Sequence, residues 1–129
     1  QQHPGTGITL QQKVTKAINL EQLVKSLGFE KVDTCDPYDL ASLSRTLDDH
    51  LESGKPSVII ARRPCVLYTR QKSTPPRVDV ELCINCGTCL EIGCSPLIQE
   101  EDHVAIDPVL CNGCGLCIQV CPSGAIIKE

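Results

Sequence analysis

Ten cysteines stand in a chain of 129 residues, and eight of them fall between Cys83 and Cys121. They form two runs, each with three cysteines separated by two residues and a fourth cysteine that closes the run. Thiolates at this spacing can wrap a short loop around an iron–sulfur cube, each sulfur binding a different iron. The spacing therefore predicts iron–sulfur chemistry, which means transfer of single electrons.

The two runs belong to an internal repeat with an offset of 28 residues. Residues 78–89 match residues 106–117, which makes chance spacing a poor explanation. The recurring residues are Asp79 and Asp107, Leu82 and Leu110, Gly87 and Gly115, and the cysteine pairs Cys83/Cys111, Cys86/Cys114 and Cys89/Cys117. We expect glycine at the Gly87 and Gly115 positions because a side chain there would crowd a backbone folded tightly about the cube.

The pattern C-x2-C-x2-C-x3-C-P is that of bacterial two-cluster ferredoxins, in which the fourth cysteine of a run ligates the other cluster. It predicts two [4Fe-4S] clusters with interleaved ligands. The first set is Cys83, Cys86, Cys89 and Cys121, and the second set is Cys111, Cys114, Cys117 and Cys94.

Cys94 departs from the pattern. Four residues instead of three separate it from Cys89, and Ser95 precedes Pro96 where proline is expected. The loop at Cys94 must therefore differ from the loop at Cys121, and the altered surroundings can shift the reduction potential of that cluster.

Two other uses of the eight cysteines stay open at this point. A disulfide framework needs an even set, but three cysteines at x2 spacing are poor geometry for several independent bridges. Paired C-x2-C motifs are also a zinc signature, although the third cysteine of each run and the closing Cys-Pro suit zinc less well.

The residues around the ligands predict a small α+β domain at 78–129. Each repeat supplies short strands and a short helix after its three-cysteine loop, and residues 96–106 form a strand, an acidic turn and a strand. With few large apolar side chains, this part must rely on metal–thiolate bonds for stability. It carries a net charge of −7, which suits either a docking face for a basic partner or a solvated exterior.

The first part, residues 1–77, has a different character, with a net charge of +3. Periodicity predicts helices over residues 19–28 and 39–52. Each is followed by a strand, at 29–35 and, as a short apolar run, at 57–61. Helix–strand–helix–strand is typical of an α/β layered domain with a parallel sheet. Two strands are too few to bury such a sheet, so we expect other protein to complete it.

Further residues of the first part have weaker signals. His3, Gly5, Thr6 and Gly7 belong to a Gly-Thr-Gly turn that can cradle phosphate, although a plain surface loop is the better explanation because short glycine motifs are common. Residues 62–65, Arg-Arg-Pro-Cys, follow the last strand at the carboxyl end, where α/β sheets bind ligands. Cys35 and Cys65 match no cluster spacing and are expected to be thiols.

Composition argues against two kinds of partner. A net charge of −4 and only three aromatic residues disfavour a nucleic-acid surface. No segment approaches the 18 or so apolar residues that a membrane span requires.

With these residues in hand, the chain resembles the C-terminal portion of the α subunit of the indolepyruvate:ferredoxin oxidoreductases, a thiamine-diphosphate-dependent 2-oxoacid:ferredoxin oxidoreductase family. The resemblance rests on the His-Pro-Gly-Thr-Gly start, residues 36–39, residues 56–65 and the two-cluster tail. It implies that 1–77 is the end of a thiamine-diphosphate-binding α/β domain plus a linker. It also implies that His3, Gly5, Thr6 and Gly7 lie near thiamine diphosphate.

The same resemblance implies the reaction and its partners. In the family, an aryl pyruvate is decarboxylated on thiamine diphosphate with Mg²⁺, coenzyme A takes the acyl group, and electrons pass through the clusters to ferredoxin. A second, β, subunit and a cytoplasmic, reducing setting are implied as well. The diphosphate-and-magnesium motif is absent here, so we expect this chain to contribute the electron relay and no catalytic residue. The alternative is a free-standing two-cluster electron carrier with an N-terminal extension.

Overall fold

The structure is a computed structural model that describes residues 4–70 and 73–128. The chain divides into two compact units, residues 1–64 and residues 65–129. The expected boundary at residue 77 follows charge and composition, whereas in the structure the connecting segment from residue 65 onward belongs to the cysteine-rich unit. The prediction for His3 lies outside the described residues.

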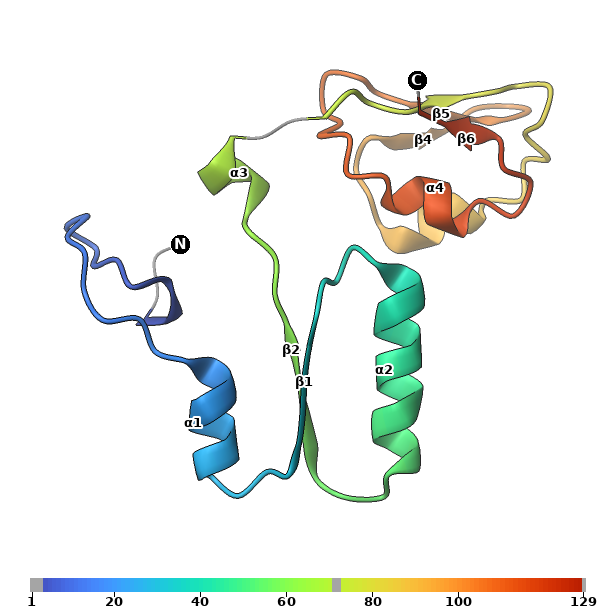
Figure 1. Cartoon of the computed structure of the whole chain (residues 1–129). Helices are drawn as coiled ribbons and strands as arrows, with labels where there is room; N and C mark the ends of the chain where they lie inside the picture. Colours follow the sequence, from blue (N-terminus) through green and yellow to red (C-terminus); the bar gives the residue numbers. More distant parts are fainter. Residues whose placement is uncertain (1–3, 71–72, 129) are drawn as a thin grey trace. The chain divides into compact units, whose positions relative to one another are not determined.

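The first unit is built from two helix–strand pairs, in the order predicted (Figure 1). A short 3-10 helix, η1 (Pro4–Thr6), is followed by α1 (Leu20–Ser26), β1 (Lys31–Cys35), α2 (Leu40–Glu52) and β2 (Ser57–Ala61). The strands pair in parallel, from Lys31 opposite Ser57 to Cys35 opposite Ala61. The two helices lie on either side of this strand pair.

Side-chain caps explain where both helices begin. The Asn19 carboxamide oxygen accepts a hydrogen bond from the Gln22 amide (3.1 Å), and the Asp39 carboxylate accepts one from the Ser42 amide (3.0 Å). Each cap satisfies an amide that the first helical turn leaves without a partner. The predicted start at Asn19 is confirmed.

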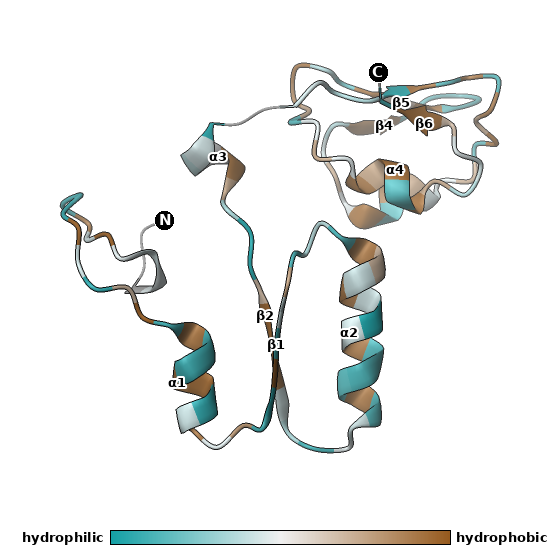
Figure 2. Cartoon of the chain, viewed as in Figure 1, coloured by the Kyte–Doolittle hydropathy of each residue, from teal (hydrophilic) through white to brown (hydrophobic). Residues whose placement is uncertain are grey.

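The first unit buries little of its apolar surface. Within residues 4–64, the side chains of Cys35 and His50 are buried, while Leu20, Leu23, Leu27, Leu47 and Leu51 are exposed. Figure 2 shows apolar residues along β2 between helices of mixed character. This matches the expectation that a two-stranded parallel sheet needs further protein to cover it.

The second unit is α+β, as predicted. After α3 (Val66–Thr69) it contains β3 (Arg77–Val78), the 3-10 helix η2 (Thr88–Ile92), β4 (Leu97–Gln99), β5 (Val104–Ile106), α4 (Leu116–Val120) and β6 (Ile126–Ile127). Strands β4 and β5 form an antiparallel hairpin around the acidic turn, and β3 pairs antiparallel with β6. The pairing of β3 with β6 thus joins residues 77–78 to residues 126–127, near the C-terminal end of the unit.

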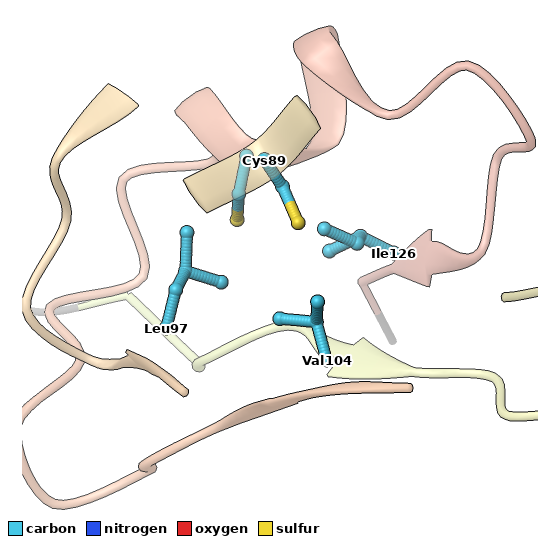
Figure 3. Close-up of a cluster of buried hydrophobic side chains, with 5 residues drawn as sticks. Cys89, Leu97, Val104 and Ile126 are labelled. Atoms are coloured by element: carbon cyan, nitrogen blue, oxygen red, sulfur yellow. The ribbon is translucent and has the colours of Figure 1, made fainter. Parts of the chain in front are cut away.

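The core of the second unit combines aliphatic side chains with two cysteines (Figure 3). Its buried members are Cys89, Leu97, Val104, Cys117 and Ile126. Leu97 and Val104 come from the β4–β5 hairpin, and the Cys89 side chain points toward them and toward Ile126. Predicted metal ligands therefore form part of the core itself.

Candidate iron–sulfur centres

The internal repeat is a structural repeat as well as a sequence repeat. The Asp79 carboxylate accepts the amide of Glu81 (3.0 Å), and the Asp107 carboxylate accepts the amide of Val109 (2.8 Å). Each aspartate also uses its backbone carbonyl to accept the amide of the first cysteine of its run, at 3.0 and 3.1 Å. The matched aspartates thus shape the same turn before each cysteine loop.

The predicted short helix is present in each copy, but it begins one residue earlier than the third cysteine and contains it. It is η2 in the first copy and α4 in the second, and the residue before each, Gly87 or Gly115, is in the left-handed conformation (φ 73° and 80°). The prediction that a side chain at these positions would crowd the surrounding backbone is wrong as far as the atoms of the protein are concerned. A Cβ on Gly87 would meet nothing within 4 Å, and one on Gly115 only the Ile118 Cδ1 at 3.8 Å. Backbone conformation is what requires glycine here.

The irregular spacing at Cys94 has a local explanation. Helix η2 ends at Gly93, which is left-handed (φ 65°), and the chain then turns into Cys94. Helix α4 instead leads directly into Cys121, which has extended backbone. The extra residue is therefore absorbed in the glycine turn, and the two closing cysteines have different loops, as the sequence predicts.

The first predicted ligand set lines a single hollow. Cys83, Cys86, Cys89 and Cys121 all contribute to its wall. The remaining wall is mainly small or apolar and includes Val78, Ile84, Gly87, Val104, Pro122, Ala125 and Ile126. Four thiols from segments more than 30 residues apart thus converge in one largely apolar enclosure.

Electrostatic coupling between thiols separates the same two sets. The pKa of Cys89 is raised by burial and also by Cys121, Cys86 and Cys83. The pKa of Cys117 is raised to about 11 by burial and also by Cys114, Cys111 and Cys94. Coupling of this kind requires proximity, and in these cases it links only members of one set.

The thiols also differ in their hydrogen bonds. The Thr88 hydroxyl donates to the Cys86 sulfur (3.4 Å), and this contact lowers the Cys86 pKa. Burial raises the pKa of Cys121, but the hydrogen bond with the Ser123 hydroxyl and those with nearby amides outweigh it and lower that pKa. For Cys94, burial and then Cys114 and Cys111 raise the pKa.

The geometry of the described cysteines is compatible with the ligands of an iron–sulfur cube. All ten cysteines are described, and none of them is in a disulfide. Within residues 4–70 and 73–128, no three His, Cys, Asp or Glu side chains meet closely enough to hold one metal ion. A cube spreads its four cysteines over four irons, so its ligands need not converge on a single point.

Three polar residues near the cysteines were not predicted from the sequence. Thr88 and Ser123 each follow a ligand by two residues, and this short spacing was the available signal. Asn85, left-handed at φ 50°, donates to the Glu101 carbonyl (3.3 Å) and accepts from Gln99 (2.7 Å). It thereby fastens the first cysteine loop to the β4–β5 turn.

Two histidines, His50 and His103, both contact aspartates. His50 Nε2 lies 2.8 Å from Asp33 and joins α2 to β1, while His103 Nδ1 lies 2.6 Å from Asp102. Both pairs are local to their units and lie outside the cysteine sets. The His50–Asp33 pair holds two elements together, whereas the His103–Asp102 pair lies within a single turn.

The Gly-Thr-Gly segment does not form the loop that leads straight into a helix. Gly7 packs against Ala17, and its carbonyl accepts the Thr15 amide (2.8 Å), so the chain makes a small hairpin before α1 begins at Leu20. Gly5 and Thr6 do line a hollow with residues 62–64 at the carboxyl ends of β1 and β2. That Gly5, Thr6 and Gly7 lie near a bound phosphate group stays a prediction.

Arg63 is already engaged at that edge. Its guanidinium pairs with the Asp36 carboxylate (2.5 Å) and stacks over the Tyr38 ring at 4.0 Å from the centroid. The basic residues after β2 thus serve in part to hold the loop after β1. None of the helices formed by the described residues has the length and apolar character that crossing a lipid bilayer requires.

Comparison with known proteins agrees with this site. Residues 104–127 match the family model of the 4Fe-4S binding domain. The chain is 37% identical to indolepyruvate oxidoreductase subunit IorA of Methanothermobacter marburgensis, over 100% of this chain and 21% of the relative. IorA of Archaeoglobus fulgidus is 33% identical over 98% of the chain, and IorA of Pyrococcus horikoshii is 36% identical over 99%; each alignment again covers 21% of the relative.

The chain thus spans about a fifth of the length of the curated relatives that it matches. The match extends through both units, so it includes the α/β segment as well as the cysteine repeat. The resemblance identified from the sequence is confirmed: this chain corresponds over its whole length to a portion of the IorA subunits of indolepyruvate oxidoreductase, and that portion includes a 4Fe-4S binding domain.

Proposed function

We propose that this chain is the iron–sulfur electron-relay portion of an indolepyruvate:ferredoxin oxidoreductase. The observation that carries the proposal is the convergence of Cys83, Cys86, Cys89 and Cys121 around one apolar hollow. This is the ligand set that an interleaved two-cluster repeat requires. Similarity to IorA over the whole chain supports the link to that enzyme.

The residues of each set have definite tasks toward a cluster. Cys83, Cys86, Cys89 and Cys121 hold the first cube, and Cys94, Cys111, Cys114 and Cys117 hold the second. When bound, a [4Fe-4S] cube accepts and releases one electron at a time. Aliphatic neighbours such as Val104 and Ile126 pack with Cys89 and Cys117 and shield these two buried sulfurs from water.

The rest of the reaction belongs to the larger protein. We assign the first unit to the end of a thiamine-diphosphate-binding domain, because its apolar surface is exposed and its sheet has two strands. Thiamine diphosphate and Mg²⁺, a second subunit, an aryl 2-oxo acid and coenzyme A would take part there. Ferredoxin would accept the electrons, in a reducing cytoplasm that preserves the clusters.

The compactness of residues 65–129 favours a second candidate, a free-standing two-cluster carrier. Exposed leucines on α1 and α2 weigh against it, because a free carrier gains nothing from an uncovered α/β segment. The two candidates differ in whether the electrons come from a 2-oxo acid bound by the same protein.

Anaerobic iron and sulfide analysis with low-temperature EPR tests the clusters. We expect about eight irons per chain, and about four in the Cys121→Ser and Cys94→Ser variants. Zinc, or about four irons in the unchanged chain, would overturn the two-cube assignment. In the assembled oxidoreductase, Cys94→Ser combined with Cys121→Ser should stop indolepyruvate-dependent reduction of ferredoxin. If reduction continues, these clusters are not the relay.

A further inference from the structure

Two hydroxyl groups contact sulfurs of the first ligand set. Thr88 donates to Cys86 at 3.4 Å, and the Ser123 oxygen lies 3.6 Å from the Cys121 sulfur. A sulfur bound to iron has no proton to give, so in the loaded site both hydroxyls must act as donors. Both side chains are half-buried, which favours persistent contacts over exchange with water.

The sulfurs of the second ligand set have different hydrogen-bond donors. Among the described residues, no side-chain hydroxyl contacts a sulfur of this set, and the backbone amide of Gly113 donates to Cys111 (3.3 Å). The repeat shows the reason at one position: Thr88 precedes the third cysteine of the first run, and Leu116 occupies the matching place in the second. An aliphatic side chain cannot donate a hydrogen bond, so the difference is built into the repeat.

Hydrogen bonds donated to the sulfurs of a cluster raise its reduction potential. Reduction adds one electron to a cube, and part of the added negative charge resides on its sulfurs. A hydrogen bond stabilises that charge more in the reduced form than in the oxidised form, which raises the reduction potential. Exposure acts in the same direction, and Cys86 of the first set is exposed to solvent.

We propose that Thr88 and Ser123 are positioning residues that give the cube held by Cys83, Cys86, Cys89 and Cys121 the higher reduction potential of the two. This inference rests on the two-cube function proposed above. With both clusters bound, an electron from oxidation of the 2-oxo acid would rest preferentially on the cube held by Cys83, Cys86, Cys89 and Cys121. A one-electron carrier outside this chain would then be reduced from this set. The hydroxyl protons stay on oxygen throughout.

The test is a potentiometric measurement of both midpoint potentials by EPR on the full chain with its clusters assembled anaerobically. Thr88→Val removes the hydroxyl with little change in shape, and Ser123→Ala removes the other. We expect each to lower the higher midpoint, with about a tenfold smaller equilibrium constant for reduction in Thr88→Val, or about 59 mV for one electron. The lower midpoint should stay unchanged.

Matched variants separate this role from a structural one. Thr88→Ser keeps the hydroxyl and should restore the unmodified midpoint, whereas Leu116→Thr introduces a hydroxyl at the matched position and should raise the lower midpoint. Iron and sulfide are measured on every sample. With about eight irons present, unchanged midpoints in both Thr88→Val and Ser123→Ala overturn the tuning proposal and leave the proposed function standing. A shift confined to the lower midpoint overturns it as well.

If Thr88→Val does not assemble both clusters, Ser123→Ala and Leu116→Thr decide by the same criteria. Fewer than about eight irons in the unmodified chain is a failure of the proposed function instead.

Discussion

Cys86 and Cys117 belong to different predicted ligand sets, and their thiols have opposite surroundings. Cys86 is exposed and accepts a hydrogen bond from Thr88, which lowers its pKa. Cys117 is buried in the core, and burial together with neighbouring thiols raises its pKa to about 11. The thiolate is the form that binds iron and attacks electrophiles. In the chain without metal, the Cys86 thiol is therefore the more reactive of the two, and the Cys117 thiol keeps its proton.

This difference predicts an order of alkylation in the reduced, metal-free chain. At pH 8 iodoacetamide should modify Cys86 early and Cys117 late, because the fraction of thiolate is increased at Cys86 and very small at Cys117. Between pH 8 and 10 the rate at Cys117 should rise about tenfold per unit, since its pKa lies above that window. Peptide mass spectrometry over time gives both rates.

Thr88→Val provides the control for Cys86. Without the hydroxyl, the Cys86 pKa should return toward its ordinary value and its alkylation should slow, while Cys117 keeps its rate. Equal rates at Cys86 and Cys117 in the unmodified chain would contradict the prediction.

The connecting segment before β3 packs on the second cysteine loop. The Ser73 amide donates to the Asn112 carbonyl (3.1 Å), and Gly113 lies directly against Ser73 and Thr74. A Cβ on Gly113 would come within 2.3 Å of the Ser73 carbonyl oxygen and 2.7 Å of the Thr74 oxygen. These are backbone atoms, which cannot rotate away as a flexible side chain does.

Gly113→Ala should therefore be much more damaging than Gly87→Ala. The two glycines have the same φ of 73°, but a methyl group on Gly87 would have no atom within 4 Å. Gly87→Ala should cost only the conformational strain, about 1–2 kcal/mol. Gly113→Ala adds displacement of the connecting segment, and we expect at least twice that loss in the free energy of unfolding of the cysteine-rich unit. Chemical denaturation followed by circular dichroism measures both; equal losses would refute the contact argument.

Sequence patterns predicted the regular elements well because local chemistry determines them. Asn19 and Asp39 cap their helices through contacts three residues away, and the β4–β5 hairpin follows from a short acidic turn. The special position of Gly113 was not predictable in this way. Its reason is a contact with Ser73, forty residues earlier in the chain, and no local pattern contains that information.

The candidate site was predictable to a similar degree. Spacing alone grouped the eight cysteines, because ligand geometry restricts spacing strongly, and the hollow around Cys121 agrees with that grouping. The hydroxyl of Ser123 and the loop clasp made by Asn85 depend on how side chains pack after folding. Small polar residues near ligands are common in sequences, so the ones that contact a sulfur or fasten a loop cannot be recognised before their packing is known.

At the scale of the whole molecule, the two units depend on different sources of stability. The first unit has helix caps, a parallel strand pair and the His50–Asp33 contact, none of which involves a predicted metal ligand. In the second unit, Cys89 and Cys117 are two of the five buried core residues, and the remaining aliphatic core is small. Metal–thiolate bonds must therefore supply much of its folding free energy.

Removal of iron should consequently destabilise the cysteine-rich unit without fully unfolding it, and it should spare the first unit. After anaerobic chelation under reducing conditions, amides in residues 97–99 and 104–106 should lose most of their protection in hydrogen–deuterium exchange, because the hairpin packs on Cys89 and Cys117. Amides in residues 31–35 and 57–61 serve as the internal control and should exchange at unchanged rates. Protection that persists in the hairpin without iron would show that its aliphatic core is sufficient, whereas a loss in both units would show that the α/β segment needs the clusters for its own stability.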